Sequence, residues 1–325
     1  MKILVRLPNW LGDMVMAAGA LQQLPAFFPG AEVCVVAKKG IHELLPFFPS
    51  SKHQFVFDKD QYKGPKGLWQ FGKKIRRVEN FDLFISFPDS FSAALMGFAT
   101  HAKQRIGYRN EGRNILLTNA YTKPRGLHRV EEYVKLLEAF TGRKAGNVDV
   151  RLHHSFHRQD YLAININSEA SSRRLTTAKA VEIISAVRKS FDERIVLIGG
   201  PRERDFVEEV FNHLPEKSGI ESIAGKTTMK ELVQVLASAK LLLTTDSGPA
   251  HLANALGTQT VVLFGAGNEN NTAPYNKEQL RVIRLGKLSC EPCTKNVCVQ
   301  FGTPQCLELL ETKIILLAMR QKLEA

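Results

Sequence analysis

The chain has 325 residues, of which 44% are hydrophobic and 23% are charged, with 23 glycines and 14 prolines. This length and composition predict two ordinary globular domains and exclude disorder over most of the chain. No apolar run reaches the roughly 18 residues that a spanning helix needs, and charge interrupts the first residues too early for a signal peptide. The 5 cysteines are too few for a secreted disulfide scaffold, so we expect a cytoplasmic protein.

The charge balance is strongly basic, since lysine and arginine together exceed aspartate and glutamate by 12. Such a surface attracts nucleic acids, anionic lipids or phosphorylated substrates, although it can also serve solubility alone. Aromatic residues are not interleaved with the basic ones, and no helix-turn-helix or RNA-binding signature is present. We therefore expect no nucleic-acid partner.

The first half of the chain alternates strand and helix patterns. Strands are predicted at residues 2–7, 32–37 and 81–87, with a helix at 13–24 and a helix or loop at 40–48. This alternation is typical of βαβ units, in which helices cover the faces of a parallel sheet.

A second series of the same kind begins near residue 160. Its strands are predicted at residues 161–167, 194–198, 241–245 and 260–264, and its helices at 176–190, 204–212, 229–239 and 249–256. The polar region 142–158 lies between the two series, so we predict an α/β protein with domains at residues 1–157 and 158–325. A final helix pattern at 307–323 has no following strand, and we expect this helix to pack back on the first domain.

Ligands of open α/β sheets bind beyond the carboxyl ends of the strands, so the residues after each strand are the candidates for a site. Leu11-Gly12-Asp13 follows the first strand. Gly12 permits a tight turn, and Asp13 can either cap the free N–H groups of the next helix or act as a general base. The glycine fingerprint of dinucleotide-binding proteins is absent here, which disfavours an oxidoreductase.

A second candidate motif runs from Asp246 to Ala253, where a predicted strand ends and a helix opens. Ser247, Gly248 and the first N–H groups of that helix can bind an anion such as a diphosphate, because the helix dipole favours negative charge there. His251 lies one turn further on and can add a donor. The alternative is a capped helix whose histidine packs locally.

Arginines mark two further stretches. Arg173 and Arg174 follow a polar loop that contains Ser168, and the planar fork of arginine suits a phosphate, although a solvated pair of charges is equally consistent. A basic stretch of the first half can meet an acidic acceptor or be a solvated loop. Its candidate residues are Arg105, Arg109, Arg113 and the following His128.

Four cysteines gather near the end of the chain, at Cys290, Cys293, Cys298 and Cys306. The first pair has the spacing of a zinc knuckle, but the later intervals do not repeat it. Zinc, disulfides and reduced thiols therefore all stay open for this cluster. Cys34 lies in a predicted strand and is expected in the core.

These motifs, taken together, resemble those of the ADP-heptose lipopolysaccharide heptosyltransferases, glycosyltransferase family 9. The resemblance covers nearly the whole chain, and its motifs occur in the family's order. They are Leu11-Gly12-Asp13, Arg105-Ile106-Gly107-Tyr108 with His128, Gly199-Gly200-Pro201, and Asp246-Ser247-Gly248-Pro249-Ala250-His251 with Leu263-Phe264-Gly265.

The resemblance implies a GT-B fold, with two Rossmann-like domains facing a cleft, the acceptor on the first and the nucleotide sugar on the second. It implies inverting transfer of heptose from ADP-heptose to the inner core of lipopolysaccharide, without metal or cofactor. Asp13 matches the family's proposed general base. The residues that match the donor motif are Asp246, Ser247, Gly248 and His251.

Other roles follow from the same resemblance. Ser168 approaches the donor phosphates, Arg173 replaces a lysine common in the family, and Glu203 is a candidate for the adenosine ribose. Arg105, Arg109, Arg113 and His128 face the anionic acceptor. The basic surface favours peripheral docking on the anionic inner membrane. The alternatives are a GT-B enzyme with another nucleotide sugar or saccharide acceptor, and a non-enzymatic protein that binds a nucleotide or an acidic polymer.

Overall fold

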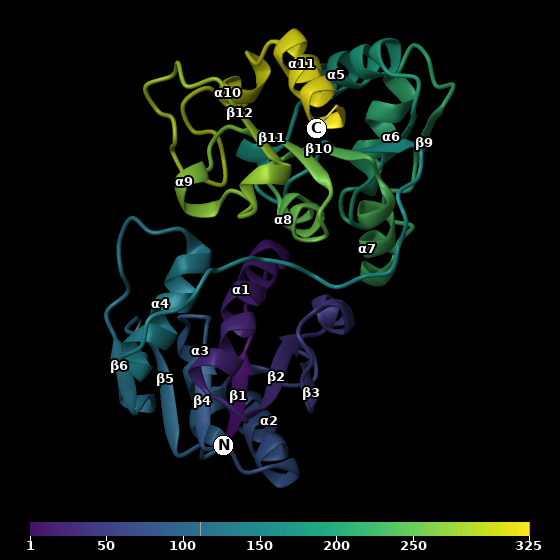
Figure 1. Ribbon diagram of the computed structural model, residues 1–325. Helices are drawn as coiled ribbons and strands as arrows, with labels where there is room; N and C mark the ends of the chain where they lie inside the picture. The colour runs from purple at the N-terminus through teal and green to yellow at the C-terminus, as the bar shows by residue number, and fades with distance from the viewer. Residues whose placement is uncertain (111, 325) are drawn as a thin grey trace. The chain divides into compact units, whose positions relative to one another are not determined.

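The computed structural model describes residues 1–110 and 112–324, and the chain forms two compact units, Met1–His153 and His154–Ala325 (Figure 1). The division lies within the predicted polar link. No helix in the described residues has both the length and the apolar character to cross a bilayer.

The first unit is built on one parallel sheet. Its strands are β1 (Lys2–Arg6), β2 (Glu32–Lys38), β3 (Gln54–Phe57), β4 (Leu83–Ser86), β5 (Gln104–Tyr108) and β6 (Asn119–Tyr121). Its helices are α1 (Leu11–Phe27), α2 (Gly64–Val78), α3 (Phe91–Ala99) and α4 (Arg129–Thr141), with short 3-10 helices η1 (Ile41–Phe47) and η2 (Arg113–Leu116). The strand order is β3-β2-β1-β4-β5-β6, which is the Rossmann order.

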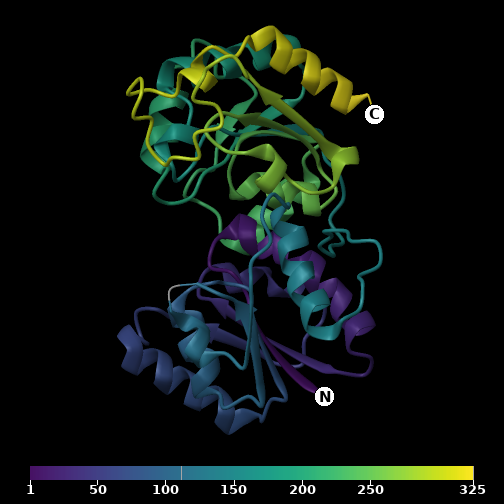
Figure 2. The ribbon, with the colours of Figure 1, turned by 90° about the vertical axis from the view of Figure 1, so that its left-hand side faces the viewer.

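Helices cover both faces of this sheet. Helices α2 and α3 lie on one side, where Phe71 and Met96 pack on Leu4 and Phe84 of the strands, and α1 and α4 lie on the other side (Figure 2). Helix α1 approaches α4 closely at Gly19, where a Cβ atom would come within 2.9 Å of a Val130 methyl group. The pairing of α1 with α4 brings distant parts of the chain together on one face of the sheet.

The second unit repeats the same plan. Its strands are β7 (Tyr161–Asn165), β8 (Arg194–Leu197), β9 (Ile220–Ser222), β10 (Leu241–Thr245), β11 (Gln259–Phe264) and β12 (Leu280–Arg284). Its helices are α5 (Thr177–Ser190), α6 (Arg204–His213), α7 (Met229–Ser238), α8 (Gly248–Ala255), α9 (Glu269–Thr272), α10 (Gln305–Glu308) and α11 (Thr312–Leu323), with turns η3 (Ser171–Arg173) and η4 (Lys277–Gln279). The order β12-β11-β10-β7-β8-β9 is again the Rossmann order, and every strand pair in both sheets is parallel. The predicted α/β class with two Rossmann-like parallel-sheet domains is confirmed.

The C-terminal helix has its own place in the second unit. Helix α11 lies beside α5 and against β10, β11 and β12 of that unit (Figure 1), while its predicted contact with the first domain stays a prediction. The reason is its apolar stripe: Ile315, Ala318 and Met319 share one face of the helix and are buried in the core of the second sheet. The helix thereby completes the second unit.

Candidate functional site

Each sheet has a topological switch point, which is where open α/β sheets bind their ligands. Between β1 and β4, and again between β7 and β10, the strand order reverses and the helices that follow the two strands cover opposite faces of the sheet. The carboxyl ends of the two strands leave a crevice at such a switch point. Asp13 follows β1, and Asp246 with Ser247 follows β10. The candidate residues of the two units therefore lie at equivalent places.

Asp13 lies in the first turn of α1, but it is not the residue that caps the helix. The N-cap is Trp10, whose side chain makes no capping hydrogen bond. The carboxylate faces α4 instead, with Oδ1 3.7 Å from Nε of Arg129, and it accepts a hydrogen bond from the hydroxyl of Tyr133. The Asp13 side chain keeps 30% of its surface exposed, so it is both held and accessible.

Charges of both signs surround Asp13. Arg129 also pairs with Glu132 at 2.8 Å, while Lys123 lies 3.3 Å from both Glu132 and Asp89, the latter in the loop after β4. Burial raises the pKa of Asp13 above its ordinary value, and Arg129, Lys123 and the Tyr133 hydroxyl oppose that rise. A raised pKa makes a carboxylate a stronger base than an ordinary one, which suits general-base catalysis.

The switch point of the second sheet holds a buried ion pair. Asp246 is 4% exposed, and its Oδ2 lies 3.3 Å from Nη1 of Arg173. The pKa of Asp246 is raised to about 6, because burial raises it by more than the nearby charges of Arg173 and Arg284 lower it. The Asp246 carboxylate leaves no room for a side chain at Gly267, where a Cβ atom would lie 2.0 Å from the same Oδ2.

Helix α8 opens toward this place without a side-chain cap. Ser247 is its N-cap, yet the Ser247 hydroxyl donates to the carbonyl of Thr245 at 3.1 Å and accepts from Asn165 at 2.8 Å. The N–H of Gly248 is thus open to an anion, as at many phosphate-binding helix starts, whereas Pro249 has no N–H and the N–H of Ala250 donates to the carbonyl of Ser247 at 3.1 Å. Gly248 begins the helix, and His251, 7% exposed, lies in its first turn.

Comparison with known proteins decides the family. Residues 68–302 match the model of glycosyltransferase family 9 (heptosyltransferase). The chain belongs to this family. It is therefore a glycosyltransferase, and the non-enzymatic interpretation is set aside.

Relatives and solved structures agree with this placement. The lipooligosaccharide heptosyltransferase 2 of Campylobacter jejuni is 28% identical over 310 residues, which are 92% of this chain and 91% of that protein. The lipopolysaccharide heptosyltransferase 2 of Escherichia coli is 26% identical and covers 88% of each chain. The structure of the ADP-heptose lipopolysaccharide heptosyltransferase II of Escherichia coli superposes with a TM-score of 0.82 at 22% identity, over 100% of this chain and 99% of that one.

Two of the other predicted donor residues of this glycosyltransferase make local bonds. The Ser168 hydroxyl donates to the carbonyl of Asp246 at 3.4 Å, which ties the loop after β7 to the start of α8. Glu203 is the N-cap of α6, and its carboxylate accepts from the N–H of Gly200 at 2.7 Å. Ser168 is thus at the switch point, while Glu203 closes the turn after the neighbouring strand β8.

The four predicted acceptor residues are not brought together. Arg105 is the second residue of β5, near the amino ends of the strands, and it donates to the carbonyls of Ala102 and Leu116. Arg113 is fully buried and donates to the carbonyls of Pro88 and Ser90 in the loop after β4. The ring of His128 caps α4. Only Arg109, which follows β5, has an exposed side chain at the carboxyl edge.

The cysteine segment supports the donor loops. The N–H of Thr294 donates to the carbonyl of Ala266 at 2.7 Å, and the N–H of Ser172 donates to Asn296 at 3.2 Å. The Ser172 hydroxyl also donates to the carbonyl of Lys295 at 2.5 Å. All the cysteines are free thiols, and in the part of the chain that the structure describes no three metal-ligating side chains gather. The segment therefore braces the turn that carries Arg173.

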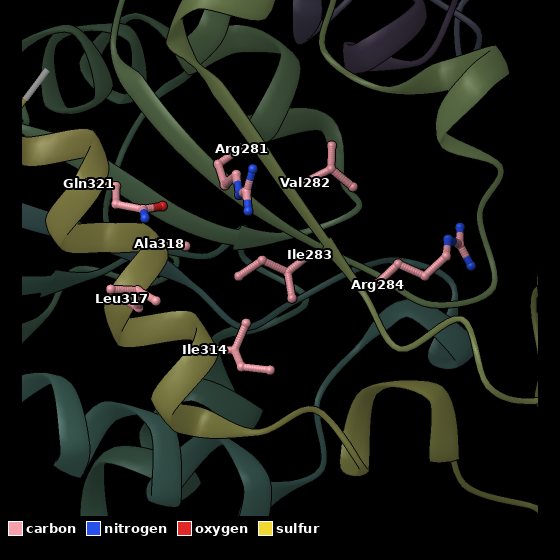
Figure 3. A pocket seen from close by; sticks show the side chains of 8 residues that line it. All are labelled: Arg281, Val282, Ile283, Arg284, Ile314, Leu317, Ala318 and Gln321. Carbon is pink, nitrogen blue, oxygen red and sulfur yellow. The ribbon is translucent and has the colours of Figure 1, made fainter.

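A cavity of about 220 Å³ lies elsewhere, at the outer edge of the second sheet (Figure 3). It is bounded by β12 and α11, with Ile283 and Leu317 among its apolar lining residues and Arg281 beside them. Strand β11 separates β12 from β10 in the sheet order, so this cavity is not at the switch point. We therefore assign it no part in the reaction.

Proposed function

We propose that this chain transfers heptose from ADP-heptose to the inner core of lipopolysaccharide, with inversion at the anomeric carbon. Its relatives are named for heptose transfer to lipopolysaccharide or lipooligosaccharide, and one solved neighbour is named for ADP-heptose. A cytoplasmic enzyme that touches the inner membrane from its inner face is part of the proposal, because the net charge of +12 suits an anionic lipid surface.

The observation that carries the proposal is the setting of Asp13. Its carboxylate is accessible, its pKa is raised by burial, and Arg129 and Tyr133 hold it in place. In the proposed reaction, Asp13 takes the proton of an acceptor hydroxyl while the oxygen of that hydroxyl attacks the anomeric carbon of heptose. The bond from that carbon to the diphosphate breaks on the opposite face, and ADP leaves.

The donor would bind at the switch point of the second unit. There the open N–H of Gly248 and the guanidinium of Arg173 suit a diphosphate, whose negative charge grows as the bond breaks. The donor residues in this proposal are Ser168, Arg173, Glu203, Asp246, Ser247, Gly248 and His251. On the acceptor side, the exposed Arg109 suits a direct contact, and Arg113 and His128 suit positioning of loops.

Nucleotide binding is the first test, by isothermal titration of the purified chain with ADP, UDP and GDP at moderate salt. Selective binding of ADP supports the proposed donor. A transfer assay follows, with ADP-heptose and a lipopolysaccharide acceptor that lacks heptose. Preference for UDP or GDP would keep the glycosyltransferase but overturn the donor, and absent transfer with tight ADP binding would overturn the acceptor.

A further inference from the structure

Trp10 is the exposed aromatic residue nearest in sequence to Asp13. Its side chain is 60% exposed, while Leu7 before it and Met14 after it are fully buried. Single exposed apolar side chains are common on proteins and indicate nothing alone. What makes Trp10 informative is that the backbone and a neighbouring charge fix its place.

The buried side chain of Arg6 holds the loop that carries Trp10. Arg6 is 3% exposed, and its guanidinium donates to the carbonyl of Val36 at 3.2 Å and to the side-chain oxygen of Asn9. Burial lowers the pKa of Arg6 to about 10, so it remains charged at neutral pH. On the other side, the Trp10 carbonyl accepts the N–H of Met14 at 2.8 Å. The indole is therefore displayed by an ordered loop.

Lys38 lies over the indole. It ends β2, which pairs in parallel with β1, so Lys38 and Trp10 share the carboxyl edge of the sheet with Asp13. The Lys38 ammonium is 6.0 Å from the ring centroid, and it forms no ion pair with any residue that the structure describes. The adjacent Lys39 is different, because Asp58 neutralises it at 2.7 Å.

The same unit contains a contrasting pair. Lys73 lies 5.7 Å from the ring centroid of Trp69, but that ring is packed against Phe98 and His101. A lysine above an indole is thus not enough to make a binding surface. Only at Trp10 is such a pair combined with exposure and with a place beside the candidate base.

We propose that Trp10 and Lys38 form an acceptor subsite for an anionic sugar ring. The flat indole takes the apolar C–H face of the ring, and the ammonium pairs with its carboxylate or phosphate. Trp10 precedes Asp13 by about one helical turn, so a sugar on the indole has its hydroxyl groups near the carboxylate. This inference rests on the proposed function, and it makes Trp10 and Lys38 binding residues rather than catalytic ones.

Kinetics with W10A and K38Q test the subsite, using ADP-heptose and heptose-deficient lipopolysaccharide. We expect the acceptor KM to rise about 10-fold in each variant, as for the loss of one good contact, with the KM for ADP-heptose unchanged. W10F should keep most of the acceptor affinity, because it retains an aromatic face. The matched control is W69F with K73Q, which should leave both KM values unchanged. An unchanged acceptor KM in W10A and K38Q would overturn the subsite.

Fluorescence decides the subsite even where transfer fails. The chain has 2 tryptophans, so W69F leaves Trp10 as the single emitter. We expect its emission to change saturably with lipid-free inner-core oligosaccharide, and less after the anionic groups of that oligosaccharide are removed. An emission change with anionic vesicles but not with the oligosaccharide would overturn the subsite in favour of membrane contact. Transfer failing in the wild type while this titration succeeds would overturn the proposed function alone.

Discussion

Asp13 can be found from the sequence, but its partners cannot. A glycine and an aspartate after a predicted strand are a local signal, which the chain shows at Gly12 and Asp13. Arg129 and Tyr133 reach Asp13 only because α4 packs beside α1. The one sequence sign is that they are four residues apart and so share a face of a helix. Side chains recruited through helix packing carry no such local signal.

Replacing Asp13 by asparagine tests the base. D13N keeps the size of the side chain but cannot accept a proton, so we expect kcat to fall at least about 100-fold, the usual worth of a general base. ADP binding should be unchanged, because the donor residues are on the other unit. Transfer rates and ADP titration measure both effects. Full transfer by D13N would contradict the assignment.

Asp246 gives a pH-dependent prediction for stability. Its pKa is about 6 in the folded chain against 3.8 for the ordinary group, so the folded state binds the proton more tightly than the unfolded state. Ionisation of Asp246 therefore lowers the free energy of unfolding as the pH rises from about 4 to about 6, by up to about 3 kcal/mol.

The variant D246N removes that cost. We expect its unfolding midpoint to match the wild type near pH 4 and to exceed it at pH 7.5, while donor binding weakens through loss of the Arg173 partner. Thermal unfolding at the two pH values checks this. A wild type that is the more stable protein at pH 7.5 would show that the ion pair outweighs the burial of charge.

At the scale of elements, long apolar strands and amphipathic helices are the best predicted. Strand β10 has its predicted bounds, whereas the final helix pattern at 307–323 divides into α10 and α11. Strand β12 is not predicted, because its sequence Leu-Arg-Val-Ile-Arg alternates with charge at the edge of the sheet. Edge strands bury less surface than central ones, so their sequences are less constrained.

The loop after β11 supplies a prediction at this scale. Gly267 has no room for a Cβ atom beside Asp246, so we expect G267A to displace the carboxylate, destabilise the chain by about 1–3 kcal/mol and weaken ADP binding. Gly146 is the matched control, since a Cβ atom there meets nothing within 4 Å. Unfolding curves and ADP titrations of G267A and G146A measure the difference. Equal behaviour of the two variants would contradict the argument.

At the scale of the whole molecule, alternation of strands and helices was sufficient to predict two sheets. It was not sufficient to predict that the terminal helix covers the second sheet, because a single apolar stripe such as that of Ile315 and Met319 does not indicate which sheet it covers. The basic residues of the first unit show the same difficulty. Arg105 and Arg113 are alike in sequence terms, yet one lies near the amino ends of the strands and the other is buried.

Each unit has its own sheet and core, which predicts that the halves fold separately. Residues 1–153 and 154–325, expressed apart, should each show a cooperative thermal transition and mixed α/β circular dichroism. As a control, residues 1–101 lack β5, β6 and α4 and should show no such transition. A half that melts without cooperativity would contradict the assignment of separate cores.

The repeated strand order also bears on how the chain acquires its structure during synthesis. All the strands of the first sheet lie before residue 122 in the sequence, and α4, which packs on that sheet, ends at residue 141. All the strands and helices of the first unit are therefore synthesised before β7, the first strand of the second sheet. Because domains generally fold as units, the N-terminal one first, we expect the first sheet to have paired its own strands before β7 to β12 begin to pair. We expect this order of synthesis to disfavour mispairing between the two similar sheets.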